Sequence, residues 1–343
     1  KYDISYLLNG TTLVSGDKFR INLELIDIHQ EKLIWGTNKE YLVNDVFLAQ
    51  DDVEFIILRS LQNSLTMGAS LSEKFVESFP NSDDYKKILN LRFTRHMDKF
   101  SVAEDNDVPY RNLLASMPEN SMLNYLFAKS LLMKVINFRS NDRKKDIIDL
   151  ENALNKSILL NPKNPLPYAL LGLIKEGHTL ANFDTDLGKQ RSNATKYVEK
   201  AIELGPENME ALYYSGKFYR IIGNFSKAIK LFEKAIEIAP FGPEEIRINL
   251  VSTHLANFDF DKASQIATSL LNQGDKRSVF IGSMFLIYIK AKTGEIKDAK
   301  NDFKIILDKY NYTKEAALYQ IRRYSPGTWT WISSEFKSTM DNL

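Results

Sequence analysis

The sequence predicts a mainly α-helical solenoid of stacked helical hairpins, with a small α/β region at its N-terminal end. Two triplets of residues recur with an offset of 34 positions: Ala194, Ala201, Pro206 and Ala228, Ala235, Pro240. A period of about 34 residues is typical of a helix–turn–helix unit that stacks on its own copies. Near the N-terminus, apolar and polar residues alternate along 18–25, which predicts a half-buried β-strand.

The residues inside one period define two helices. One face of the first helix is built by residues spaced three, one and three apart: Leu212, Ser215, Gly216 and Tyr219. Gly223 and Asn224 then predict a break, because these residue types commonly end helices. The second helix carries a stripe of small and aromatic residues: Ala228, Phe232 and Ala235. A single hairpin cannot cover both apolar faces, so neighbouring units are expected to stack.

This pattern resembles the tetratricopeptide repeat. In that family a bulky residue, Leu-Gly and Tyr on the first helix are followed by Ala, Phe, Ala and Pro. The unit from Leu212 to Pro240 departs from the pattern at Ser215, where the family has Leu. The resemblance implies a tetratricopeptide-type solenoid whose first helices line a concave groove.

Weaker copies of the unit lie on both sides. Pro118 and Pro162 begin two upstream copies, and Ala263 and Ala299 mark the second helices of two downstream copies. We therefore predict about five units between residues 121 and 310, followed by a closing helix at 313–323 that acts as a terminal cap. The polar residues 178–189 are expected to form a long loop within one unit.

The first seventy residues have a different pattern. Residues 6–13, 18–25 and 33–41 predict three antiparallel strands, with a hairpin turn at 15–17. A helix with an apolar stripe is expected at 44–65, after a capping Asn-Asp pair. Three strands and one helix form a thin layer that leaves one sheet face without cover. This suggests that the domain is incomplete.

This region resembles the TolB-like α/β domain found upstream of tetratricopeptide repeats in bacterial signalling proteins. The resemblance rests on residues 6–11, 20–27, Trp35 and 45–51, and it departs from the family at 29–32. Proteins with this arrangement carry an OmpR-type winged-helix DNA-binding domain or a class III adenylate or guanylate cyclase domain. CadC-like membrane-spanning regulators are relatives in architecture. Neither output domain is contained in these residues.

The combined patterns predict three regions. A truncated TolB-like domain spans 1–70, a helical connector spans 71–118, and the repeat solenoid with its capping helix spans 119–343. The connector contains an amphipathic stripe at 85–100. The acidic residues 104–107 are expected to form a solvated loop, because they lack the central Gly and closing Glu of a calcium-binding EF-hand.

Composition excludes some functions for this chain. Its 45 basic and 44 acidic residues give a net charge of +1, whereas nucleic-acid binding usually needs a basic face. The longest apolar run, 279–289, is shorter than the roughly 20 residues that span a bilayer. We expect no membrane span and no nucleic-acid contact. The absence of cysteine fits both cytoplasm and periplasm, so the localisation stays open.

No catalytic or metal-binding motif is found in the sequence. The four histidines lie far apart and lack the spacing of metal ligands: His29, His96, His178 and His254. Asp51 and Asp52 are expected at a helix start, where the dipole favours negative charge. Trp329 and Trp331 are expected to pack against the last helix, with a binding edge as the alternative. We predict a non-enzymatic chain without cofactor or metal.

The candidate binding residues follow from the implied groove. Tyr213, Lys217 and Arg220 lie three and four apart on a face beside the core-facing side of their helix. The same wall is continued by residues of the following units: Glu245, Ile248, Ser252, Met284 and Tyr288. A basic and aromatic stripe fits a carboxylate or an acidic peptide. Charge reversal at Lys217 and Arg220 is expected to abolish binding without changing the melting temperature.

Three functions remain open from the sequence. The first is a sensory or protein-interaction region of a bacterial transcriptional regulator. It would bind a protein, peptide or small effector and control a DNA-binding domain, with a homodimer as a possible functional state. The second is the regulatory region of a class III nucleotide cyclase. The third is a stand-alone tetratricopeptide adaptor.

Overall fold

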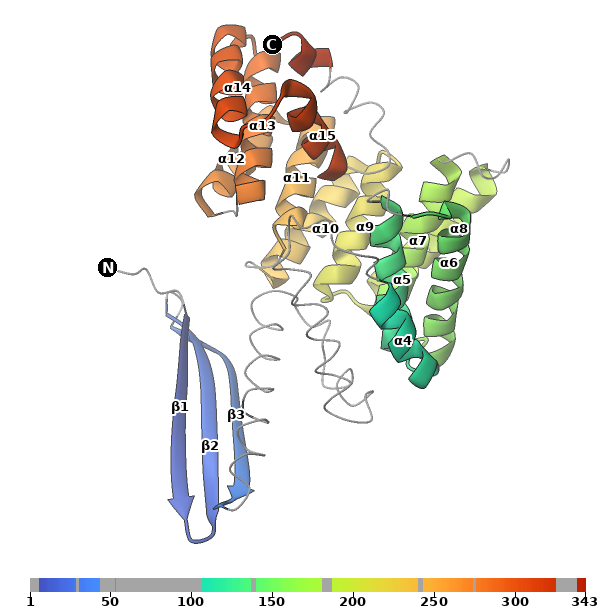
Figure 1. The fold of residues 1–343 in the computed structure, drawn as a ribbon, viewed down its shortest axis with the longest axis vertical. Coiled ribbons are helices and arrows are strands. Elements are labelled where there is room, and N and C mark those ends of the chain that lie inside the picture. Colours follow the sequence, from blue (N-terminus) through green and yellow to red (C-terminus); the bar gives the residue numbers. More distant parts are fainter. Residues whose placement is uncertain are drawn as a thin grey trace. The chain divides into compact units, whose positions relative to one another are not determined.

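The computed structural model describes residues 6–28, 31–43, 53, 107–136, 140–180, 187–239, 243–273, 276–324 and 338–343 (Figure 1). The chain divides into two compact units, residues 1–71 and 72–343. The first contains a three-stranded antiparallel sheet, and the second contains a succession of helices. The predicted fold class, a helical-hairpin solenoid with a small N-terminal antiparallel meander, is therefore confirmed.

The sheet is a simple meander. Strands β1 (Tyr6–Ser15), β2 (Lys18–Asp27) and β3 (Lys32–Leu42) pair in the order β1-β2-β3. Gly16 has a φ of 64° in the turn between β1 and β2, a conformation that glycine adopts without a Cβ clash. The strands match the predicted ones and extend them by one or two residues at their ends.

The alternation along β2 separates a buried face from a charged face. Phe19, Leu23 and Leu25 are buried. On the other face, Glu40 of β3 forms ion pairs with Lys18 at 2.8 Å and with Arg20 at 3.1 Å. The predicted helix at 44–65, except residue 53, and the predicted amphipathic helix at 85–100 lie outside the described residues.

The second unit is built from consecutive helical hairpins. They are α5 (Ser121–Ile136) with α6 (Arg143–Leu160), α7 (Pro165–Leu180) with α8 (Leu187–Leu204), α9 (Met209–Ile221) with α10 (Phe225–Ile238), α11 (Glu244–Ala256) with α12 (Phe260–Gln273), and α13 (Lys276–Lys292) with α14 (Ile296–Tyr310). Helix α4 (Val108–Ser116) precedes them, and α15 (Lys314–Tyr324) follows. The first helix of each hairpin contacts the first helix of the next, so the hairpins stack in chain order, from green to red in Figure 1.

Small residues recur where helices approach most closely. The recurring alanines of the second helices have no exposed surface: Ala194, Ala228, Ala263 and Ala299. A Cβ on Gly216 of α9 would lie 2.7 Å from Cε1 of Phe232 in α10. In the preceding hairpin, a Cβ on Gly172 would lie 2.5 Å from Cγ2 of Val198. Only glycine fits these two contacts, because real Cβ atoms do not approach so closely.

The break between α9 and α10 follows from its two residues. Gly223 has a φ of 81°, and the backbone N–H of Asn224 donates to the carbonyl of Tyr219 at 2.8 Å. The side chain of Asn224 then accepts a hydrogen bond from the backbone N–H of Lys227 and caps α10. One glycine therefore ends the first helix and the next residue begins the second.

The expected long loop at 178–189 is shorter than predicted. Residues 178–180 belong to α7 and residues 187–189 belong to α8, so the helices extend into the polar stretch from both ends. Glycine inside a helix costs about 1 kcal/mol relative to alanine. Gly177 and Gly188 are nevertheless helical, because packing of the hairpin outweighs such local preferences.

Candidate functional site

Polar side chains connect the first helices of different hairpins. The hydroxyl of Tyr125 in α5 donates to Oε1 of Glu210 in α9 at 3.0 Å, and Lys129 forms an ion pair with the same carboxylate. Arg277 of α13 donates to Glu245 of α11 at 2.6 Å. We call these residues, together with Tyr213, Lys217 and Asn249, the polar seam. It joins α5, α9, α11 and α13.

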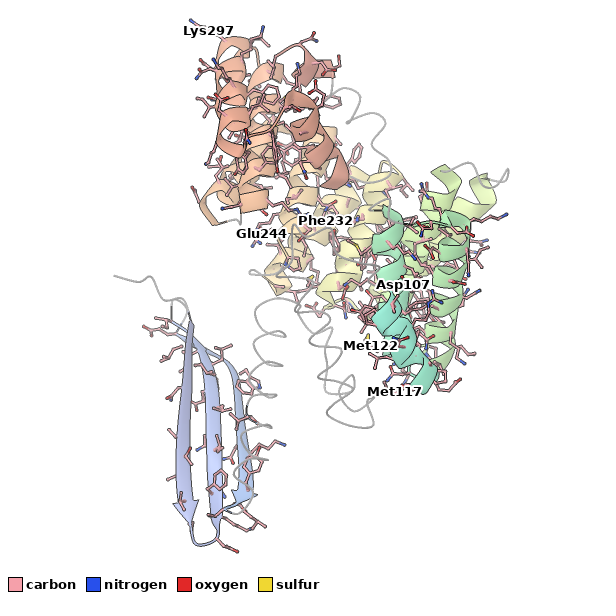
Figure 2. The ribbon with its side chains drawn as sticks, in the orientation of Figure 1. Asp107, Met117, Met122, Phe232, Glu244 and Lys297 are labelled. Carbon is pink, nitrogen blue, oxygen red and sulfur yellow. The ribbon has the colours of Figure 1, made fainter. Side chains whose placement is uncertain are left out.

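A second contact reinforces the junction between α11 and α13. Glu244, which is labelled in Figure 2, begins α11 and accepts a hydrogen bond from the hydroxyl of Ser278 in α13. Glu244 and Glu245 also lie in the first turn of α11, where the helix dipole stabilises negative charge. Both carboxylates are thus held by their own helix and by its neighbour.

Tyr213 and Lys217 occupy the centre of the polar seam. Nζ of Lys217 lies 5.4 Å from the centre of the Tyr213 ring, a distance at which a cation is attracted to an aromatic face. The Tyr213 ring also lies 5.2 Å from the ring of Tyr214 and 6.2 Å from the ring of Phe232. The hydroxyl of Tyr213 is 3.5 Å from Nδ2 of Asn249, at the upper limit of a hydrogen bond.

Burial shifts the pKa values of the two titratable side chains at this centre, Lys217 and Tyr213. Burial, and next the nearby positive charge of Arg220, lower the pKa of Lys217 to about 8. Burial, and next Glu245, raise the pKa of the Tyr213 hydroxyl above its usual value. Lys217 keeps part of its surface exposed, so it is partly dehydrated and still accessible from solvent. An anion that reached it would restore the interactions that its ammonium group lost with water.

Arg220 differs from its two neighbours because only 5% of its surface is exposed. A carboxylate placed at such a position loses its hydration, which costs several kcal/mol in real proteins. Because of this burial, we expect charge reversal at Arg220 to lower the melting temperature, in place of the unchanged value expected from the sequence. Lys217 keeps part of its surface exposed and is therefore the better residue of this pair for a binding test.

The other three candidate residues lie in the interior. Ile248 and Tyr288 belong to the hydrophobic cluster that packs α11 to α15 together, and Ser252 is also buried. The structure thus brings Tyr213, Lys217 and Arg220 together on α9 and places Ile248, Ser252 and Tyr288 in the packed interior. A binding role for any of the six stays a prediction.

Several residues of the polar seam escaped the sequence analysis, although the partners Glu245 and Tyr213 were expected on the groove wall. Arg277 is 32 positions from Glu245, and Asn249 is 36 positions from Tyr213, so each is separated from its partner by about one repeat. That offset is a signal that could have found Arg277 and Asn249. Tyr125 and Glu210 are 85 positions apart, and no local pattern connects them.

The described residues contain neither a candidate membrane span nor a candidate metal site. Within the described ranges, no helix has the length and apolar character needed to cross a bilayer. In the same ranges, no three His, Cys, Asp or Glu side chains gather in a way that fits a metal ion. Asp51, Asp52, Trp329 and Trp331 lie outside the described residues.

The stacked hairpins and their linked first helices define a helical-repeat scaffold. Residues 209–241 match the family model of the tetratricopeptide repeat, which confirms a tetratricopeptide repeat region in this chain. The match covers the unit with the closest sequence resemblance, formed by α9 and α10.

Several solved structures are similar to this chain. A thermophilic tetratricopeptide repeat protein of Thermus thermophilus, TTC0263, is 15% identical, with 56% of this chain and 92% of that protein covered at a TM-score of 0.46. PilW, a type IV pilus biogenesis factor, is 14% identical, with 69% and 97% covered at 0.47. YrrB, described as a tetratricopeptide repeat protein with an unusual peptide-binding site, is 16% identical, with 56% and 92% covered at 0.38.

Proposed function

We propose that the repeat region binds a protein or peptide partner at the polar seam and acts without catalysis. The observation that carries this proposal is the chain of contacts between charged and aromatic side chains of α5, α9, α11 and α13. Tyr125, Glu210 and Asn249 are buried in it, whereas the remaining members keep part of their surface exposed: Lys129, Tyr213, Lys217, Glu245 and Arg277. A surface shared by several repeats suits an extended ligand, because each repeat contributes one group to recognition. The tetratricopeptide repeat is a protein-interaction fold, which supports the same conclusion.

We propose that the ligand presents a carboxylate to Lys217. The lysine is partly dehydrated, and the adjacent Tyr213 ring offers an apolar surface beside the charge. A charge-assisted hydrogen bond to a carboxylate is about twice as strong as a neutral one. An acidic peptide with an aromatic or aliphatic side chain next to the carboxylate therefore fits this position best.

The test uses fluorescein-labelled acidic peptides and fluorescence anisotropy with the full chain. Lys217→Glu is expected to weaken binding by about tenfold or more, since it replaces attraction by repulsion, which corresponds to roughly 1.4 kcal/mol. Lys230→Glu, an exposed site on α10, makes the same charge change away from the seam and is expected to bind as the wild type. Equal affinities of Lys217→Glu and wild type would contradict the proposed site.

We further propose that this region serves a transcriptional regulator as its partner-binding part. This finer role is supported only by the resemblance of the first seventy residues to a TolB-like domain. The amino-acid sequence encoded before Lys1 in the gene tests it directly. A winged-helix domain there would support the regulator, whereas a cyclase domain would contradict it and favour the alternative role. Sedimentation velocity of the full chain tests the proposed homodimer.

A further inference from the structure

Lys217 differs from the other half-buried lysines on the first helices of the hairpins. Each of those lysines pairs with a carboxylate: Lys129 and Lys134 of α5, Lys175 of α7 and Lys290 of α13. Nζ of Lys217 forms no hydrogen bond or ion pair with a described residue and lies 5.4 Å from the centre of the Tyr213 ring. This amine is therefore held partly out of water without an acceptor oxygen.

The surroundings of Lys217 disfavour its charged form. Arg220 lies one turn further along α9, where two like charges repel each other. Its guanidinium stays charged and has only 5% of its surface exposed, so water screens this repulsion poorly. Burial and this charge lower the pKa of Lys217 to about 8, and Glu245 opposes them. The charge of Glu245 is offset by Arg277, which lies 2.6 Å away.

A partly neutral amine in this position is a nucleophile that suits carbon dioxide. Lysines become nucleophilic when they are desolvated or lie beside another cation, and both conditions hold for Lys217. Carbon dioxide is small and uncharged, so it reaches a half-buried amine without losing the hydration that an anionic acyl donor would lose. The product of the reaction is an anion. It converts the repulsion between Lys217 and Arg220 into attraction.

We propose that Nζ of Lys217 reacts reversibly with carbon dioxide to form a carbamate, so that this lysine is a modification site. The lone pair of the neutral amine attacks the carbon of carbon dioxide, and an N–C bond forms while one C=O π pair moves onto oxygen. The nitrogen then releases a proton to water. No electron is transferred and no further reactant is needed, and protonation of the nitrogen followed by loss of carbon dioxide reverses the reaction.

The carbamate places a negative charge at the centre of the polar seam. If the seam binds a ligand carboxylate at Lys217, the modification replaces attraction by repulsion and lowers the affinity for the ligand. This consequence rests on the proposed function. The reaction with carbon dioxide does not, because it depends only on the amine and its neighbours.

The experiment equilibrates the full chain with carbon dioxide near pH 8, the pKa of Lys217, and fixes carbamates by ethylation with triethyloxonium tetrafluoroborate. Mass spectrometry after digestion locates the ethoxycarbonyl groups. We expect Lys217 to be labelled roughly tenfold more than Lys230, an exposed lysine on α10, because full hydration favours the charged form of an amine. Assignment to a residue also separates Lys217 from an α-amino group that reacts with carbon dioxide.

A second readout is the 13C NMR spectrum of the chain in 13C-labelled bicarbonate. One carbamate signal is expected in the wild type and in Lys230→Arg and is expected to be lost in Lys217→Arg, because a guanidinium does not deprotonate. Both variants keep the positive charge, and their melting temperatures show that they fold. The proposal is overturned if Lys217 is labelled no more than Lys230, or if a folded Lys217→Arg keeps every carbamate signal of the wild type.

The effect on ligand binding is measured separately, by anisotropy of the labelled acidic peptides with and without carbon dioxide at constant pH and ionic strength. We expect carbon dioxide to weaken binding to the wild type and to have no effect on the affinity of Lys217→Arg, whatever that affinity is. Labelling of Lys217 in a chain that binds no acidic peptide would support the modification and contradict the proposed function. Peptide binding without labelling of Lys217 would do the reverse.

Discussion

At the scale of single residues, Gly216 shows how closely the helices of one hairpin pack. The substitution Gly216→Ala introduces a Cβ 2.7 Å from the ring of Phe232, so either the ring or the helix must move. We expect a loss of about 1–3 kcal/mol of unfolding free energy, as for other overpacked cores. Urea unfolding measures it. Phe232→Leu in the same chain should recover part of the loss, and strictly additive effects would contradict direct contact between the two residues.

Ser215 is a buried polar residue where the repeat family has an apolar one. Its hydroxyl is fully buried and has no hydrogen-bond partner among the described residues. Removing an unsatisfied hydroxyl relieves its desolvation cost, so we expect Ser215→Ala to stabilise the protein by about 1 kcal/mol. Ser130→Ala is the matched control, because that buried hydroxyl donates to the carbonyl of Phe127 at 2.7 Å. The prediction fails if both variants shift the urea midpoint equally.

Lys217 gives the stability of the protein a pH dependence with a defined sign. The folded state loses the proton near pH 8, whereas the unfolded chain keeps it up to about 10.5. Between these values the unfolded state binds more protons, so stability rises with pH. We expect Lys217→Met to remove this rise in urea unfolding across the window. Tyr213 acts in the opposite direction above pH 10, so the difference between wild type and variant is the quantity to follow.

At the scale of helices, the caps decide where each repeat turns. Asn224 caps α10 through the backbone N–H of Lys227. We expect Asn224→Ala to cost about 1 kcal/mol and Asn224→Asp to cost little, because aspartate is an equally good N-cap. Thermal melting followed by circular dichroism compares the two variants. A loss of the same size in both would show that the cap is not the cause.

The predicted helices were located from local patterns, and their limits depended on packing. The break at Gly223 and the buried stripe of Ala228, Phe232 and Ala235 agree with the structure, since both follow from spacing within one helix. The ends of α7 and α8 were misplaced, because a polar stretch with two glycines looks like a loop until a neighbouring helix stabilises it.

At the scale of the repeat region, each hairpin is supported by its neighbours. A hairpin in the middle contacts one hairpin on each side, whereas a terminal hairpin has a hairpin on one side and a single helix, α4 or α15, on the other. We expect native-state hydrogen exchange to be slowest in α9, α10 and α11 and faster in α5, α6, α13 and α14. Uniform protection along the chain would indicate one cooperative core in place of a linear array.

The sequence predicted the relative positions of candidate-site residues only where they lie on the same helix. Tyr213, Lys217 and Arg220 lie on one helix, so their shared position followed from their spacing. The burial of Ile248 and Tyr288 did not, because it depends on how α11 to α15 pack around one cluster. The partners Tyr125 and Lys129 were missed, because they reach Glu210 from a helix two hairpins away.

Periodicity along the chain was sufficient to establish the repeat, the meander and the class of interaction fold, because periods of two, 3.6 and about 34 residues reflect the geometry of strands, helices and hairpins. The rotation of each helix against helices from other repeats set which side chains meet, as in the pairs of the polar seam. The rotation of a helix depends on its packing against all of its neighbours, so it cannot be predicted from a short segment of the sequence.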